Sequence, residues 1–196
     1  FTTGYLTQKG RPEGNKISMA IPNVEIRNIF TSQIMEFFIG QVKEDGHTLH
    51  QFCDALERGD AKKVEKCFTG YLKKTISICD TFVKKPMKEN FYHDILLGIL
   101  REIDKWGISS DRETGDDHSD IVVETENSAT GIILEIKHAH DGKLEESCEN
   151  ALEQIVNTHY EEKMKNEGVD RILKYGIVCY KKRCKVQLIG EEEGIL

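Results

Sequence analysis

Residues 131–137, with the sequence GIILEIK, constrain the fold more than any other part of this chain. Apolar residues occupy both faces that these positions would have in a strand, a pattern typical of a central strand covered on both sides. Residues 120–124 predict a neighbouring strand, and the turn-prone stretch 125–130 separates the two. The segment therefore predicts a layered α/β architecture in which helices cover a sheet.

The remaining periodicity places a helical region before this sheet. Short alternating runs at residues 4–8 and 16–21 predict a β-hairpin, and Asn23 is a candidate N-cap for a helix through about residue 43. Two or three more helices are expected within residues 45–82. The further elements, in chain order, are an apolar, buried helix over 90–106 that ends at Gly107, strands over 108–113, 120–124 and 131–137, a helix over 144–166, and strands over 172–180 and 184–189.

The composition is that of a soluble globular protein. With 196 residues, 38% of them hydrophobic and 31% charged, the chain suffices for one domain, or for one domain with an appendage. No apolar run approaches the roughly 20 residues that a membrane helix needs, and the start at Phe1 without a signal-peptide pattern indicates a chain cut from a longer one. The six cysteines are scattered without a C-x-x-C pair, which favours reduced thiols and a cytoplasmic location. The formal net charge of −7 implies that any binding of nucleic acid must be local.

Three charged residues on the two central strands form the candidate site. If the turn is centred between Asn127 and Ser128, Asp120 lies directly opposite Glu135. Directly opposed residues share a face and lie about 5 Å apart. Lys137 follows Glu135 by two positions, so its side chain leaves the same face of the strand.

This set of side chains suits metal-assisted hydrolysis of a phosphodiester. Two carboxylates at such a distance repel each other unless a divalent cation lies between them, and oxygen ligands favour Mg²⁺ or Mn²⁺. Lys137 would then lie close enough to orient the attacking water or to contact a phosphate oxygen. The alternative is an exposed, salt-bridged face without a site. The apolar surroundings of Glu135 favour a site, because a charge in a central strand is costly.

Asp120 together with the Glu-x-Lys of residues 135–137 resembles the PD-(D/E)XK nuclease superfamily. More closely, residues 89–188 resemble the C-terminal nuclease-like domain of bacterial AAA-ATPase-like proteins. The strings that carry this resemblance are NFYH (90–93), RETG (112–115), DI (120–121), LEIK (134–137), ALEQI (151–155) and KYGI (174–177). Two N-terminal strings, TGYLT (3–7) and IPNVE (21–25), resemble the end of that family's ATPase-like region.

The resemblance implies a restriction-endonuclease-like domain over residues 86–196, preceded by residues 1–85 as the end of an ATPase-like portion or a connector. It implies nucleic acid, with DNA favoured, and an upstream ATPase-like region of the same polypeptide as partners. It also implies the following roles: Asp120, Glu135 and the backbone carbonyl of Ile136 bind Mg²⁺ or Mn²⁺, Lys137 is the catalytic lysine, Gln154 acts beside it together with Tyr160, and Glu113 and His93 are further metal ligands.

The chain departs from the family pattern just before Asp120. Relatives have E-S-G-x-G-R-x-D there, whereas residues 113–120 read ETGDDHSD, so His118 replaces the arginine and Asp117 replaces the second glycine. A phosphate contact is thereby lost and negative charge is gained. A second function therefore stays open, a catalytically inactive nuclease-fold module that binds nucleic acid or a partner protein. The chain also has no Walker A string, so it does not bind ATP by that route.

Other residues have competing interpretations. A buried, hydrogen-bonded core histidine is as good an interpretation of His93 as a metal ligand. Strand alternation directs His138 and His140 away from Glu135. The basic run 181–183 would be either a phosphate contact or a solvated hairpin tip, and the second is favoured.

Overall fold

The computed structural model describes residues 5–12, 14–75, 88–110, 120–126, 130–139, 142–156 and 160–189, apart from the side chains of residues 34, 75, 120, 156 and 160. The chain forms two compact units, Phe1–Gly40 and Gln41–Leu196. Within the described ranges, no helix has the length and apolar character needed to cross a membrane.

The first unit contains the predicted N-terminal hairpin. Strands β1 (Thr7–Gln8) and β2 (Met19–Ala20) pair antiparallel. Helix α1 (Val24–Glu44) follows, and the Asn23 carboxamide oxygen accepts a hydrogen bond from the Ile26 N–H at 3.0 Å. Asn23 is therefore the N-cap that the sequence predicts.

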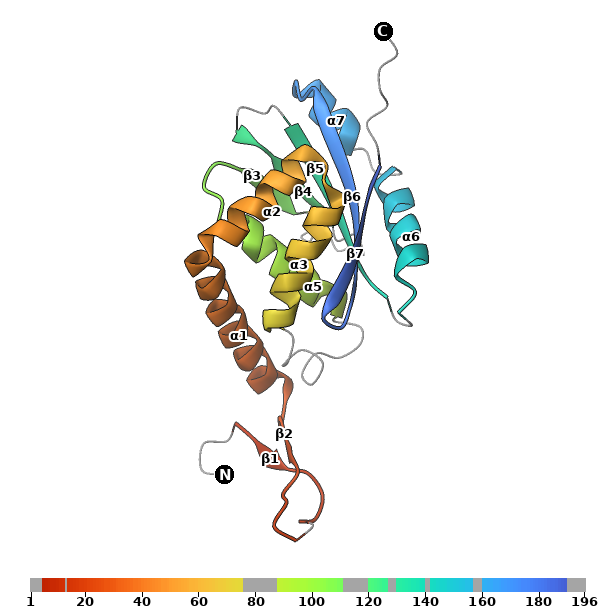
Figure 1. The fold of residues 1–196 in the computed structure, drawn as a ribbon. Coiled ribbons are helices and arrows are strands. Elements are labelled where there is room, and N and C mark those ends of the chain that lie inside the picture. Colours follow the sequence, from red (N-terminus) through yellow and green to blue (C-terminus); the bar gives the residue numbers. More distant parts are fainter. Residues whose placement is uncertain are drawn as a thin grey trace. The chain divides into compact units, whose positions relative to one another are not determined.

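The second unit is built on a sheet of five strands in the order β3-β4-β5-β6-β7 (Figure 1). The strands are β3 (Gly107–Ser110), β4 (Asp120–Glu124), β5 (Thr130–His138), β6 (Arg171–Tyr180) and β7 (Arg183–Ile189). Strand β5 pairs antiparallel with β4 and parallel with β6, whereas the other two pairs are antiparallel. The GIILEIK strand thus lies at the centre of a mixed sheet, as its two apolar faces predict.

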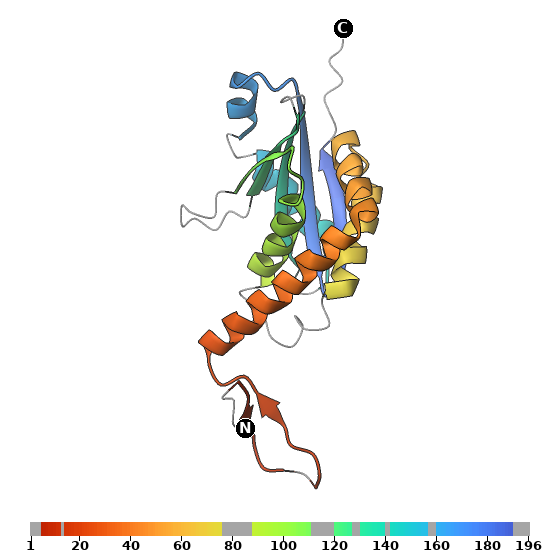
Figure 2. The same cartoon turned by 90° about the vertical axis from the view of Figure 1, so that its left-hand side faces the viewer.

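Helices cover both faces of the sheet. The Tyr175 hydroxyl donates to the Leu56 carbonyl of α2 (Gly46–Arg58) at 2.8 Å, which places α2 on the face of Tyr175. A Cβ added at Gly176 would lie 3.0 Å from Leu152 of α6 (Leu144–Val156). Because adjacent strand residues face opposite sides, α2 and α6 cover opposite faces. Figures 1 and 2 show α3 (Ala61–Thr75) beside α2, and Met164 of α7 (Tyr160–Asn166) packs with α6 residues against β5.

One predicted helix has different boundaries in the structure. The apolar helix is α5 (Lys88–Leu100), which ends six residues before Trp106. The following backbone bonds tighten to i→i−3 at residues 102 and 103, and the Trp106 indole N–H donates to Glu57 of α2 at 3.2 Å. Contacts with α2 therefore override the helical periodicity there. Within the helix predicted over 144–166, the structure describes α6 and α7, and residues 157–159 lie outside the described residues.

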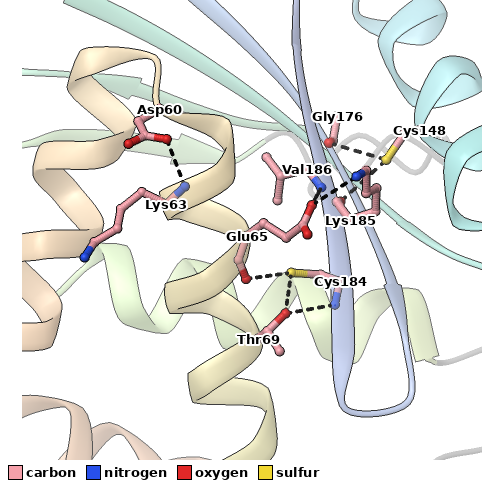
Figure 3. A network of polar contacts seen from close by, with 9 residues as sticks. All are labelled: Asp60, Lys63, Glu65, Thr69, Cys148, Gly176, Cys184, Lys185 and Val186. Carbon is pink, nitrogen blue, oxygen red and sulfur yellow. Dashed lines mark hydrogen bonds and ion pairs between the residues drawn. The ribbon is translucent and has the colours of Figure 1, made fainter.

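Helix α3 is fixed to the edge strand β7 by a polar network (Figure 3). The Glu65 carboxylate accepts the Val186 N–H at 3.1 Å and lies 3.6 Å from the Lys185 ammonium. The Thr69 hydroxyl accepts the Cys184 N–H at 3.3 Å, and the Cys184 thiol donates to the Glu65 carbonyl at 3.6 Å. Within the second compact unit, Gln41–Leu196, this network ties α3 to the sheet.

Candidate active site

The register of β4 and β5 brings Asp120 opposite Glu135. The five paired positions run from Asp120↔Glu135 to Glu124↔Gly131, as a turn centred between Asn127 and Ser128 predicts. Asp120 is the first residue of β4, and the structure describes its backbone but not its side chain. The predicted pairing of the two acidic positions is confirmed at the level of the backbone.

Glu135 is a fully buried acid in the middle of the sheet. Its side chain is 0% exposed and lies on the face that α6 covers, beside Gly176 of the parallel neighbour β6. Neither carboxylate oxygen accepts a hydrogen bond from any residue that the structure describes. A buried ionised carboxylate without donors is costly, so this side chain needs positive charge beside it.

Lys137 supplies positive charge on the same face. Its ammonium lies 2.8 Å from one oxygen of Glu135, an ion pair without hydrogen-bond alignment. A second carboxylate, Glu89, lies 3.5 Å from the same nitrogen. The Lys137 side chain is 23% exposed, so part of this side chain reaches the surface. The structure thus brings together the glutamate and the lysine of the predicted set.

Glu89 is a site residue that the sequence analysis missed. It lies in the first turn of α5, and its second oxygen accepts the His138 N–H at 3.1 Å. The next N–H along the strand, that of Ala139, bonds to β6, so the His138 N–H points toward the opposite, β4 side. The pairing of β4 with β5 extends as far as Asp120 and Glu135. Beyond this pair, the Glu89 carboxylate accepts the N–H hydrogen bond of His138 on β5. The sequence feature that could have indicated Glu89 is its position directly before the NFYH string, in the first turn of a helix.

The backbone carbonyl of Ile136 also points toward the β4 side. Backbone groups of successive strand residues alternate in direction, so Ile136 and His138 share one side of β5. Ile136 follows the residue paired with Asp120, which places its carbonyl near the start of β4. This orientation is compatible with the metal-ligand role that the resemblance implies.

The two histidines near the site lie on the other face of the sheet. His93 of α5 is 1% exposed and shares a hydrogen bond of 3.0 Å with the Ser110 hydroxyl. Ser110 pairs with Ile121, which is adjacent to Asp120 and therefore faces the opposite side. The His138 ring stacks on Tyr92 of α5, with centroids 5.9 Å apart, so its predicted orientation away from Glu135 is confirmed. The structure does not bring His93 to the acidic pair.

The remaining candidates are only partly described. Gln154 is half-buried on α6, the helix that covers the face of Glu135. Tyr160 begins α7, but its side chain is not described. Glu113, the string Asp116–His118 and His140 lie outside the described residues. Among the described side chains, which do not include that of Asp120, no three or more His, Cys, Asp or Glu are arranged to hold a metal ion.

Thiols do not contribute a charged ligand here. Cys148 of α6 lies under β6 and β7, donating to the Lys185 carbonyl at 3.5 Å (Figure 3). Burial raises the pKa of this thiol to about 12, and burial likewise raises the pKa of Cys184 to about 12. Both thiols are therefore neutral at physiological pH. The metal ligands that the resemblance implies, Asp120, Glu135 and the Ile136 carbonyl, have hard oxygen atoms, which suit Mg²⁺ or Mn²⁺ better than a softer metal.

Comparison with known proteins gives one result. A family model described as the PD-(D/E)XK nuclease superfamily matches residues 87–188, slightly more than half of the chain. This range includes the whole of strands β3 to β7 except Ile189, and with them Asp120, Glu135 and Lys137. Neither the curated proteins nor the solved structures contain a significant match.

Proposed function

Because this chain belongs to the PD-(D/E)XK nuclease superfamily, we propose that it is a metal-dependent nuclease that hydrolyses phosphodiester bonds of nucleic acid, with DNA the favoured substrate. The observation that carries the proposal is Glu135. A fully buried carboxylate with no hydrogen-bond donor among the described residues, beside a partly exposed lysine, is a costly arrangement. Such an arrangement is expected where a site holds a cation.

The residues around Glu135 fit a divalent metal ion. Asp120, Glu135 and the carbonyl of Ile136 would hold Mg²⁺ or Mn²⁺, and Glu113 is proposed as a further ligand. All of these are hard oxygen donors, the kind that both ions prefer. When bound, the ion would supply positive charge beside the scissile phosphate and favour ionisation of water. His93 is left out of this set, because it is buried on the opposite face of the sheet.

Lys137 acts on the nucleophile and on the phosphate in this proposal. Its ammonium donates hydrogen bonds that orient the attacking water, and it offsets the negative charge that develops on the phosphate. Glu89 and Glu135 hold the ammonium from two directions, at 3.5 and 2.8 Å. Glu89 is thus a positioning residue. Gln154, on the helix above this face, is proposed to contact Lys137 or the substrate.

A cleavage assay tests the proposal. Labelled duplex DNA, single-stranded DNA and RNA are incubated with the parent protein in Mg²⁺, in Mn²⁺ and in EDTA. Lys137→Ala should lower metal-dependent cleavage by about 100-fold or more, in line with the loss of one preorganised donor. Lys185→Ala is the matched control, since Lys185 lies on the same sheet in an ion pair with Glu65. Equal activity of Lys137→Ala and the parent would refute the assignment.

A second candidate is a catalytically inactive module that binds nucleic acid or a partner protein. The acidic string Asp116–Asp117 and the net charge of −7 favour the loss of catalysis, because negative charge repels the scissile phosphate, and they favour a partner protein over nucleic acid as the ligand. Titration calorimetry with Mn²⁺ separates the two functions. Binding heat that disappears in Asp120→Asn supports the enzyme, whereas absence of binding at millimolar metal supports the module.

The N-terminal strings TGYLT and IPNVE support a related proposal about context. Residues 1–85 would connect the nuclease domain to an ATPase-like portion upstream in the same polypeptide. Sequencing the reading frame upstream of residue 1 tests this directly. An upstream region without nucleotide-binding motifs would argue against it.

A further inference from the structure

The turn between β6 and β7 concentrates positive charge in an acidic protein. Its three successive cations, Lys181, Lys182 and Arg183, are all exposed, whereas the chain has a net charge of −7. Sequence alone favours a solvated hairpin tip for this run. Its place in the fold argues for a function.

The turn lies at the same end of the sheet as Lys137. Strands β5 and β6 run parallel, and Lys137 pairs with Val178. Tyr180 is two residues beyond Val178. At about 3.3 Å per residue, the turn therefore begins about 7–10 Å along β6 from the position paired with Lys137. Figure 1 shows this turn at the end of the sheet where β5 leads toward α6. That separation is about two to three base steps, at about 3.4 Å each along a duplex.

The cations of the turn also lie on the active-site face. Tyr180 packs against a cluster that includes Cys148 and Val178, on the face covered by α6. The Lys181 ammonium lies 5.3 Å from the centre of the Tyr180 ring, and the Arg183 guanidinium lies 5.8 Å from it. Contact with the ring holds both cations on that side without neutralising their charge. Neither forms an ion pair with a residue in the described part of the chain.

The backbone of the turn is fixed to the site. The Tyr92 hydroxyl donates to the Lys181 carbonyl at 2.9 Å, and the Tyr92 ring stacks on His138, the residue after Lys137. Lys181 adopts a positive φ of 54°, a conformation that glycine or asparagine takes more readily. A lysine at this position carries a conformational cost that a solvated tip does not require.

We infer that Lys181 and Arg183 bind phosphates of the nucleic-acid backbone about two to three base steps from the scissile bond. The Arg183 guanidinium can bind a phosphate through two parallel N–H hydrogen bonds, and the Lys181 ammonium attracts a phosphate as a point charge. Because the contact is to phosphates and not to base edges, it contributes affinity without sequence preference. This inference rests on the proposed function, because it assigns part of that site's substrate binding.

Binding measured without cleavage tests the inference. Fluorescence anisotropy of a labelled 20-mer duplex, and of RNA of the same sequence, is recorded in EDTA from 50 to 200 mM KCl. The test variant is Lys181→Asn with Arg183→Gln, because asparagine accepts the positive φ and glutamine keeps part of the stem over Tyr180. The control variant is Lys163→Gln with Lys165→Gln, which removes the same charge from α7. The melting temperature of each variant verifies its fold.

We expect the turn variant to bind about 10-fold more weakly at 50 mM salt. On duplex DNA the slope of log K against log salt should be shallower by about 1.8, since each of the two cations neutralises one phosphate and each neutralised phosphate contributes about 0.9. The control should stay close to the parent in both quantities. The arm with the larger slope change, DNA or RNA, identifies the polymer that the turn contacts.

Two outcomes would overturn the inference: affinity and salt slope equal to those of the parent, or an equal loss in the turn and control variants. A cleaving parent whose turn variant binds normally would refute this contact alone. A parent that binds through the turn but cuts nothing would support the contact and refute the proposed catalysis.

Discussion

Replacing Lys137 by methionine tests whether Glu135 is a buried charge that depends on one cation. The Glu135 side chain is 0% exposed, and its closest described cation is the Lys137 ammonium at 2.8 Å. Removing one partner of a buried pair typically costs about 3–5 kcal/mol. Because the Lys137 side chain is 23% exposed, solvent screens the pair, and we expect a loss of about 2–4 kcal/mol in the free energy of unfolding. Domains have about 5–15 kcal/mol of stability, so the variant should stay folded.

The double variant Lys137→Met/Glu135→Gln removes the charge as well as its partner. Its stability should lie within about 1 kcal/mol of the parent, because no uncompensated charge is buried. Urea unfolding followed by circular dichroism measures all variants, first in EDTA and then in millimolar Mn²⁺. If Glu135 binds metal, Mn²⁺ should restore the single variant and leave the double variant unchanged.

The result that refutes this reasoning is a Lys137→Met variant as stable as the parent in EDTA. A double variant as unstable as the single one would also contradict it, since the loss would then come from the packing of the lysine stem. Lys185→Met controls for the loss of a half-buried lysine on the same sheet, and it should respond to Mn²⁺ as the parent does.

Three further predictions concern single positions. Glu89→Gln should lower the rate of metal-dependent cleavage about 10-fold, because the ammonium of Lys137 loses one anchor; an unchanged rate in the cleavage assay would contradict this. Gly176→Ala should destabilise the fold by about 1–3 kcal/mol in urea unfolding, since a Cβ there lies 3.0 Å from Leu152. Hydrogen bonds with Lys74 lower the pKa of Asp45 to about 2, so the stability that it adds is present above its usual 3.8 and is lost as pH falls toward 2. Acid titrations of the parent and Asp45→Asn should therefore differ at pH 6 and converge near pH 2.

The sequence predicts the candidate site better than its surroundings. The pairing of Asp120 with Glu135 follows from a short turn and two adjacent strands, so local pattern is sufficient. The central position of β5 follows from its two apolar faces. Both properties depend on residues close in sequence.

Features that depend on distant contacts were missed. Glu89 approaches Lys137 across 48 residues of chain, and a glutamate in a first helical turn has an ordinary explanation in the helix dipole. The packing of α3 on β7 depends on Glu65 contacting Val186, 121 residues away. No periodicity in the sequence encodes such a contact.

The carboxylate of Glu65 has a consequence for how this molecule behaves at high concentration. Strand β7 is the last strand of its sheet, and the middle of such a strand normally offers unpaired N–H groups to another polypeptide. At Val186, the carboxylate of Glu65 from helix α3 already accepts the hydrogen bond of this N–H group. Addition of a foreign strand to this edge of the sheet is therefore disfavoured at Val186.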